Sequence, residues 1–310
     1  MIRDTEAEPL RRWLGFTPSP ATVADLIAHP GFTGAARALN HVKVTAAADP
    51  VMAAFSRDAG HYVAASLAFS LHRDGDITLP RLKAACAHAR FMSPGRARAM
   101  LGYLQHVGFV TRTSARDGQR AAVFAPTQRF TEVWCGRMRR GLETAAVLEP
   151  AVRPLLARMD DPAIAVAFAQ NRGDSIRAGL AAATSHDTPF VRIFNHRLGG
   201  GRALALLLSR DHGDGALAEA PVPWTLDDCA GHCGIPRVQA RRLFADAVAE
   251  GLVDFDGATL SWRPVARQFI VYSSAFEFAS MLASAAATVF AATPPSGLSD
   301  SAPGGRPGGG

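Results

Sequence analysis

The sequence predicts a mainly α fold with small β-hairpin wings, built from two copies of one unit that form a pseudo-two-fold internal repeat. The chain has 310 residues, of which 48% are hydrophobic, which is enough for two substantial cores. Its two halves show a weak self-similarity. In each half, helical hydrophobic spacing gives way to two short stretches of β-type alternation, which places a hairpin behind a group of helices.

The internal repeat fixes the expected organisation of the chain. The segment ITLPRLKAACA at 77–87 resembles WTLDDCAGHCG at 224–234. After it, the offset between the copies settles at 143 positions, so that Ala97 corresponds to Ala240 and Gly108 to Gly251. The repeat predicts an N-terminal segment at 1–19, a first copy at 20–149, a second copy at 150–293, and a Gly/Pro-rich tail at 294–310 too poor in apolar residues to become ordered.

The first copy reads as three helices followed by a hairpin. An amphipathic helix is predicted at 60–74 and a short second helix at 79–86. Ser93 supplies an N-cap for a third helix, whose apolar spacing continues until Gly108. The stretch 109–124 then alternates around an Asp-Gly turn, which is typical of a β-hairpin.

The second copy follows the same order. Helices are predicted at 200–211, 225–234 and 236–250, and the hairpin at 252–264 is several residues shorter. Both copies are flanked by further helical stretches, at 20–40 and 127–148 for the first copy and at 160–183 and 264–291 for the second.

A helix, a turn, a helix and a hairpin wing make a winged helix-turn-helix, so a tandem winged helix-turn-helix is expected. In element order, over roughly 20–148 and 160–291, the chain resembles winged-helix regulators of the MarR type. In that family the wing typically carries an acidic residue, an arginine and a threonine, and Asp117, Arg120 and Thr127 stand in comparable places; the second copy lacks the motif. The resemblance implies a sequence-specific, double-stranded DNA-binding transcriptional regulator of the bacterial cytoplasm, associated with the nucleoid.

The candidate DNA contacts follow from what a recognition helix needs. Its N-terminal half reaches base edges through polar or basic side chains, while the opposite face packs on the core. The outward positions of the third helix and the arginines of the wing give the first set, and the equivalent helix of the second copy gives the other. These candidate residues are Ser93, Arg96, Arg98, Tyr103, Arg112, Arg116 and Arg120 in the first copy and Arg237, Arg241 and Arg242 in the second.

The charge distribution favours the first copy as the main DNA contact. The chain carries a net charge of +6, and nearly all its cations are arginines, whose planar fork suits phosphates and base edges. Residues 73–140 contain 13 basic and 4 acidic side chains, whereas residues 202–271 contain 7 basic and 9 acidic ones. Because affinity for phosphates scales with the charge that is neutralised, the first copy is expected to dominate binding.

Other chemistries find little support in the sequence. Cys229 and Cys233 flank His232, but no second ligand pair occurs, so packing is expected rather than metal binding, and no cofactor or enzyme motif is found. The N-terminus lacks the apolar core of a signal peptide. The apolar stretch 276–292 is interrupted by polar residues and is expected to be a packed helix without a membrane partner.

Two other functions remain open at this stage. Plasmid replication initiators also carry two unequal winged helices in one chain, and an iterated origin site would distinguish them from a promoter-binding regulator. A tandem winged-helix interaction scaffold is the third possibility, although such scaffolds tend to be acidic. The sequence also leaves open whether the chain forms a homodimer and whether it responds to a small-molecule effector.

Overall fold

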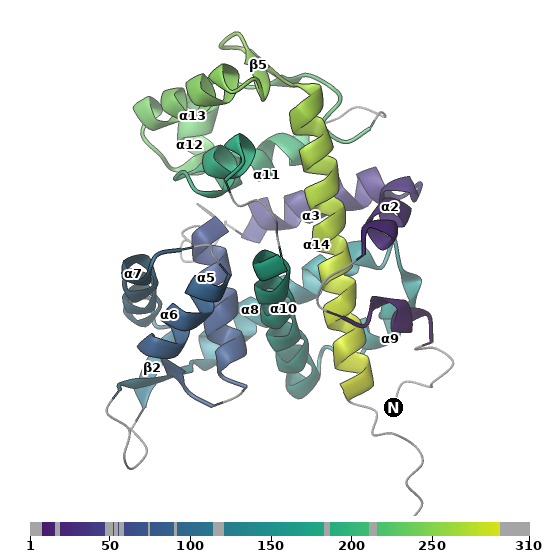
Figure 1. Ribbon diagram of the computed structural model, residues 1–310, viewed down its shortest axis with the longest axis vertical. Helices are drawn as coiled ribbons and strands as arrows, with labels where there is room; N and C mark the ends of the chain where they lie inside the picture. Colours follow the sequence, from purple (N-terminus) through teal and green to yellow (C-terminus); the bar gives the residue numbers. More distant parts are fainter. Residues whose placement is uncertain are drawn as a thin grey trace, which may run out of the picture.

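The structure is a computed structural model that describes residues 8–15, 19–46, 52, 55, 59–73, 75–89, 92–113, 121–182, 187–210 and 216–291. It is mainly helical with two small three-stranded antiparallel sheets (Figure 1), which confirms the expected mainly α fold with small hairpins. The predicted Asp-Gly turn of the first hairpin and the C-terminal tail lie outside the described residues.

The first copy contains a unit of three helices and three strands, which we call the first unit. Its sheet has the order β1-β3-β2, with both pairs antiparallel. In chain order the elements are α5 (Ala59–Leu71), β1 (Ile77–Thr78), α6 (Leu79–His88), α7 (Pro94–His106), β2 (Val110–Thr113) and β3 (Val123–Pro126), and α8 (Gln128–Ala145) follows.

The second copy contains an equivalent unit, which we call the second unit. Its sheet has the corresponding order β4-β6-β5, again antiparallel. The elements are α11 (Gly200–Arg210), β4 (Val222–Pro223), α12 (Leu226–Cys233), α13 (Arg237–Ala249), β5 (Val253–Phe255) and β6 (Thr259–Trp262), followed by α14 (Pro264–Ala291). The short strands β1 and β4, each of two residues, were not expected from the sequence.

The helix ends follow from local chemistry. Ser93 Oγ accepts a hydrogen bond from Arg96 N at 3.3 Å and caps α7, as the sequence predicts. Thr225 and Asp228 form a reciprocal capping box at the start of α12. Both α7 and α13 are followed by a left-handed glycine, Gly108 with φ 71° and Gly251 with φ 66°, where a side chain would strain the backbone.

Further helices precede and connect the two units. The predicted helical stretch at 20–40 is in fact two helices, because His29 takes the extended conformation (ψ 130°) that Pro30 favours in the residue before it. The remaining elements are η1 (Glu8–Trp13), α2 (Pro20–Ala28), α3 (Phe32–Thr45), η3 (Pro150–Val152), α9 (Arg153–Leu156), α10 (Pro162–Ala182) and the π-helical turn η4 (Val191–Asn195).

The two copies exchange helices. The helix before the first unit, α3, packs on α11 of the second unit, and the helix before the second unit, α10, packs on α5 of the first. The helices that follow the hairpins, α8 and α14, contact each other, and α14 runs along α10 through the centre of the molecule (Figure 1). The contacts are reciprocal, as a pseudo-two-fold relation between the copies requires.

The contact between α5 and α10 is unusually close. A Cβ added to Gly173 would stand 2.5 Å from the carbonyl oxygen of Ser66 and 2.7 Å from Cβ of Ser70. As a result α5 is buried along nearly its whole length, so the prediction of an amphipathic helix is wrong. Its serines tolerate burial because Ser66 and Ser70 donate their hydroxyls to carbonyls of the same helix.

The buried side chains of both copies form one continuous hydrophobic core. In the first copy, stacked aromatic rings of Phe55, Phe109 and Phe130 lie at its centre, with Trp134 against them. By length and composition, α14 is the one helix among the described residues that could span a bilayer, but 67% of its most apolar window is buried, as expected for a packed helix. Such burial is that of a core helix.

Candidate nucleic-acid interface

Helix α7 presents two different faces. Ala97, Met100, Leu101 and Leu104 are buried against the first unit, which fixes the helix on its sheet and on α6. On the outer face, Arg98 is exposed, and no ion-pair or hydrogen-bond partner for it lies among the residues that the structure describes. The helix contains no acidic residue, so this face carries positive charge alone.

The other candidates of the first copy occupy different environments. Arg112 is exposed on β2, the strand adjacent to α7, and Arg96 is half-buried on the first turn of α7. Tyr103 does not belong to the outer face, contrary to expectation, because its ring packs on Phe55 with centroids 5.6 Å apart. Arg116 and Arg120 lie outside the described residues.

Thr127 ties the end of the hairpin to the end of α7. Its hydroxyl donates to the carbonyl oxygen of Gly108 at 2.8 Å and accepts from Phe130 N at 3.2 Å, so it also caps α8. In the second copy, Arg263 takes this backbone place: Arg263 N donates to Leu252 O, as Thr127 N donates to Phe109 O. The base of the hairpin is therefore joined to the end of α7.

Helix α13 presents a comparable outer face. Arg237 is engaged, with its Nε 3.0 Å from Asp227 Oδ1. Arg241 and Arg242 are exposed, and within the described part of the chain neither has an ion-pair or hydrogen-bond partner. Val238, which the sequence analysis overlooked, is 57% exposed on the same face.

Most acidic side chains of the second unit form ion pairs or hydrogen bonds within the chain. At the C-terminal end of α13, the C-cap residue Glu250 pairs with Arg192 at 3.1 Å and Asp246 pairs with Arg197; both arginines lie outside the range counted in the sequence. In the hairpin, Asp254 accepts from Arg263 at 3.0 Å. The acidic count of the second copy therefore exaggerates the negative charge that its outer face carries.

A second acidic residue of the hairpin, Asp256, stabilises the turn in which it lies. The Asp256 carboxylate accepts hydrogen bonds from Ala258 N at 2.9 Å and from Thr259 N at 2.7 Å. These backbone donors hold the pKa of Asp256 below its ordinary value. The shorter hairpin of the second copy is therefore closed by its own acidic residue.

The two outer faces correspond position by position. Beyond the ends of α7 and α13, Phe109 N donates to Leu104 O and Leu252 N donates to Ala247 O, both at 2.8 Å and at the same offset of 143 positions. By this offset Arg98 corresponds to Arg241, whereas Ala99 corresponds to Arg242 and Gly95 to Val238. The offset of 143 positions in the sequence repeat is thus a signal for this correspondence.

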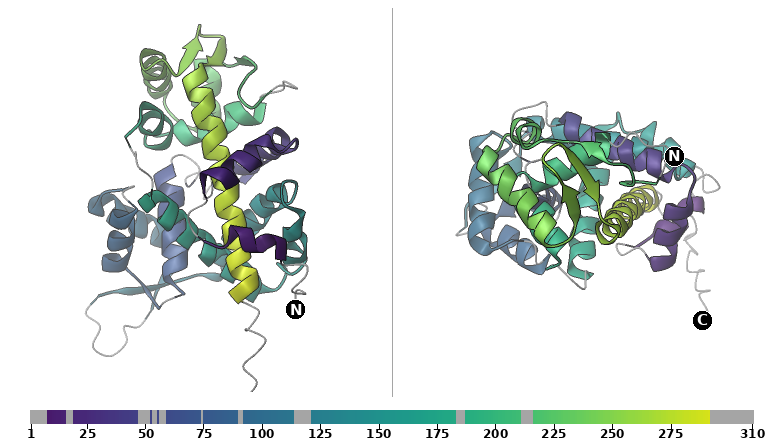
Figure 2. Two further views of the ribbon diagram at one scale, coloured as in Figure 1. Left: turned by 45° about the vertical axis from the view of Figure 1, so that its right-hand side comes forward. Right: turned by 90° about the horizontal axis from the view of Figure 1, so that it is seen from above.

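The two helices lie on the same side of the molecule. In Figure 1 and in both views of Figure 2, α7 and α13 lie on the side opposite to the lower part of α14 and to α9. The helix exchange places them there, because α3 and α10 hold each unit against the other. The two helices that carry these arginines therefore lie on one side of a single chain.

The cysteines of α12 pack in the core. Cys229 and Cys233 are buried, with their sulfurs 4.0 Å apart. The hydrogen bond with Cys233, followed by burial, raises the pKa of Cys229. No group of three His, Cys, Asp or Glu side chains that could hold a metal ion occurs among the described residues.

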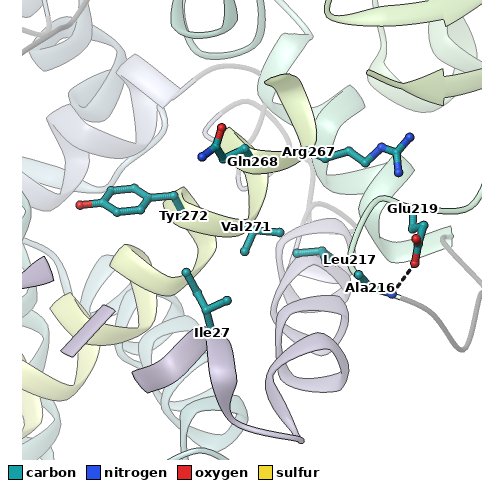
Figure 3. Close-up of a pocket in the computed structure, with 8 residues that line it drawn as sticks. All are labelled: Ile27, Ala216, Leu217, Glu219, Arg267, Gln268, Val271 and Tyr272. Carbon is teal, nitrogen blue, oxygen red and sulfur yellow. Dashed lines mark hydrogen bonds between the residues drawn. The ribbon is translucent and has the colours of Figure 1, made fainter. Parts of the chain in front are cut away.

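A hollow of about 370 Å³ lies on another part of the surface, between α2, the turn at 216–219 and the first turns of α14 (Figure 3). Ile27, Leu217 and Val271 give it an apolar lining. Its charged groups are already engaged: Glu219 accepts from Ala216 N at 2.9 Å, and Arg267 Nε donates to Trp262 O at 2.9 Å.

Comparisons with models of protein families, with curated proteins and with solved structures gave no match.

Proposed function

We propose that this chain is a sequence-specific, double-stranded DNA-binding transcriptional regulator that works in a bacterial cytoplasm, with the first unit as its dominant contact. The observation that carries the proposal is the outer face of α7, where exposed Arg98 has no partner in the described chain and where Arg112 is exposed on the neighbouring strand. Exposed arginines without internal partners are available to phosphates and base edges.

The element order supports the proposal. Each unit carries two packed helices, α6 with α7 and α12 with α13, next to a three-stranded antiparallel sheet. This is the order of a winged helix-turn-helix, in which the second helix of the pair enters the major groove and the hairpin flanks it. A major groove about 12 Å wide admits one α-helix.

Charge supports the dominance of the first unit. Residues 73–140 hold 13 basic side chains against 4 acidic ones. In the second unit the arginines of the hairpin and of the first turn of α13 are spent on internal pairs, Arg263 with Asp254 and Arg237 with Asp227. Fewer cations remain there to neutralise phosphates.

The proposal is tested with the full chain. Its binding to a mixed-sequence duplex is measured by fluorescence anisotropy over a series of salt concentrations. We expect log K to fall linearly with log[salt], with a slope of roughly −0.9 for each phosphate contact. The double variant Arg98→Ala/Arg112→Ala should bind more weakly and with a shallower slope.

Arg153→Ala provides the matched control. Arg153 is also exposed, has no partner among the described residues, and lies on α9, away from α7 (Figure 1). Its loss should leave affinity nearly unchanged. If the wild-type chain shows no salt-dependent binding to duplex DNA, or if Arg153→Ala weakens binding as much as the double variant, the proposed function fails.

A further inference from the structure

We infer that one chain reads a bipartite, non-palindromic DNA site, in which α7 and α13 contact two half-sites that share a G·C pair and differ beside it. The inference rests on the proposed function and adds the class of DNA that the chain selects. It follows from three observations. The helix exchange is completed within one chain, α7 and α13 lie on the same side of the molecule, and these two helices expose different side chains.

The helix exchange completes a two-fold arrangement inside one polypeptide. Helix α3 covers α11, α10 covers α5, and α8 contacts α14, so each copy supplies what a second subunit would supply in a dimer of single units. Along α14, Ile270, Phe278 and Leu282 are buried, and of its large apolar side chains only Val265 and Tyr272 are exposed. Little apolar surface of α14 is left for a second chain to cover.

The arrangement gives one chain two helices for one DNA face. Both α7 and α13 lie on the same side of the molecule (Figures 1 and 2). Two recognition helices held on one surface reach successive major grooves when their half-sites are about 10 base pairs or a multiple of this apart. The site is then expected to have two parts with a fixed spacing.

The shared element of the two half-sites comes from Arg98 and Arg241. These side chains occupy equivalent positions, are exposed, and lack partners among the described residues. An arginine in the major groove donates two hydrogen bonds to O6 and N7 of guanine, which is the commonest specific contact. The same position of each half-site should therefore carry a G·C pair.

The difference between the half-sites comes from the neighbouring positions. Where α7 has Ala99, α13 has exposed Arg242, and where α7 has Gly95, α13 has exposed Val238. A second arginine selects a further guanine or a phosphate, and an apolar side chain contacts the methyl group of thymine. The half-site read by α13 should therefore contain sequence information that the other half-site lacks.

The second unit is electrostatically able to approach DNA. The acidic side chains of α13 and of its C-cap are Asp246 and Glu250, and they pair with Arg197 and Arg192. The capping acids Asp227 and Asp228 are held by Arg237 and by Thr225. The outward charge left on the first half of α13 is that of Arg241 and Arg242.

The test is selection of a random duplex library by the full-length chain, followed by native mass measurement of the complex with the selected duplex. We expect two unlike half-sites at a fixed spacing and one chain per duplex. On that duplex, Arg98→Ala should lose roughly 5- to 150-fold affinity and relax preference in one half-site only. Arg241→Ala and Arg242→Ala should relax preference in the other half-site only.

The outcomes separate the inference from the proposed function. A palindromic site bound by two chains overturns the inference and leaves DNA binding intact. Enrichment of a single half-site, to which Arg241→Ala and Arg242→Ala bind as tightly as the wild type, likewise overturns the inference and leaves DNA binding intact. A library from which no sequence is enriched, together with no salt-dependent binding, overturns the proposed function itself. Circular dichroism of each variant checks that the fold is retained.

Discussion

Lys43 of α3 donates a hydrogen bond from Nζ to Glu277 Oε2 of α14 at 2.6 Å, and this ion pair joins the helix before the first unit to the helix after the second. Burial alone would raise the pKa of Glu277, but the charges of Lys43, Arg172 and Arg137 outweigh burial and hold that pKa below its ordinary value of 4.5. One carboxylate thus balances cations from three helices.

Removing this carboxylate should destabilise the junction of the copies. Glu277→Gln leaves its cations uncompensated, and we expect a loss of roughly 1–3 kcal/mol in the free energy of unfolding, less than for a fully buried pair. The expected loss of stability is smaller than for a fully buried pair because the side chains of Lys43 and Glu277 remain 29% and 24% exposed. Because the folded-state pKa is lowered, the contribution is present above pH 4.5 and disappears as pH falls through the folded-state pKa.

Denaturant unfolding of the wild type and of Glu277→Gln between pH 3 and pH 7 measures the difference in their free energies of unfolding. Glu132→Gln is the control, since Glu132 is exposed on α8 and its one partner among the described residues is the neutral Gln128, which donates to it at 2.7 Å. It should change stability by less than about 0.5 kcal/mol. A difference between wild type and Glu277→Gln that grew as the pH fell would contradict the assignment.

The contact of α10 with α5 should not tolerate a side chain at Gly173. Gly173→Ala would place Cβ 2.5 Å from the Ser66 carbonyl oxygen, so the helices must separate. We expect a loss of roughly 1–3 kcal/mol. Gly136→Ala on α8, where nothing lies within 4 Å, should instead stabilise the protein by about 0.4–1 kcal/mol. Equal melting temperatures for the two variants would refute the close packing.

The four cysteines should be inert in the native protein. All are buried, and burial raises the pKa of Cys86 and of Cys135 to about 11. Thiolate is the reactive form, so labelling with a thiol reagent at pH 8 should be slow until denaturant unfolds the chain. One thiol reacting at once with native protein would show that a buried cysteine is accessible.

Arg98 and Arg112 should differ in what their loss does to DNA binding. Arg112→Ala should remove a phosphate contact, so it should weaken binding to all sequences alike and reduce the salt slope by roughly 1. Arg98→Ala should instead change the sequence preference. Competition binding with the selected duplex and with a scrambled duplex measures both effects. Identical losses on both duplexes for both variants would mean that Arg98 reads no base.

The sequence predicted the elements whose signals are local. Ser93 and Gly108 mark the ends of α7, and the same glycine signal ends α13 at Gly251. The two-residue strands β1 and β4 escaped prediction because two residues are too few to show alternation. Their pairing depends on where the hairpin folds back.

Non-local packing could not be predicted. The spacing at 60–74 predicts an amphipathic helix, and only the approach of Gly173 from a distant part of the sequence explains the burial of its serines. The helical spacing of Tyr103 suits the outer face of α7, yet its ring packs against Phe55 of the aromatic core. Glu277 interrupts an apolar stretch in the sequence, and a lone acid in such a stretch is a signal that a partly buried cation, here Lys43, lies opposite.

The exchange of α3 and α10 also constrains the order in which the chain folds during synthesis. Helix α5 leaves the ribosome early but gains its cover only when 162–182 has been made, and α3 waits still longer for α11. The nascent first copy must therefore hold the faces of α5 and α3 that α10 and α11 later cover without their final partners. Contacts this distant in sequence slow folding, so refolding of the complete chain should be slower than its high helix content suggests, and binding of a chaperone should be strongest while the second copy is still being translated.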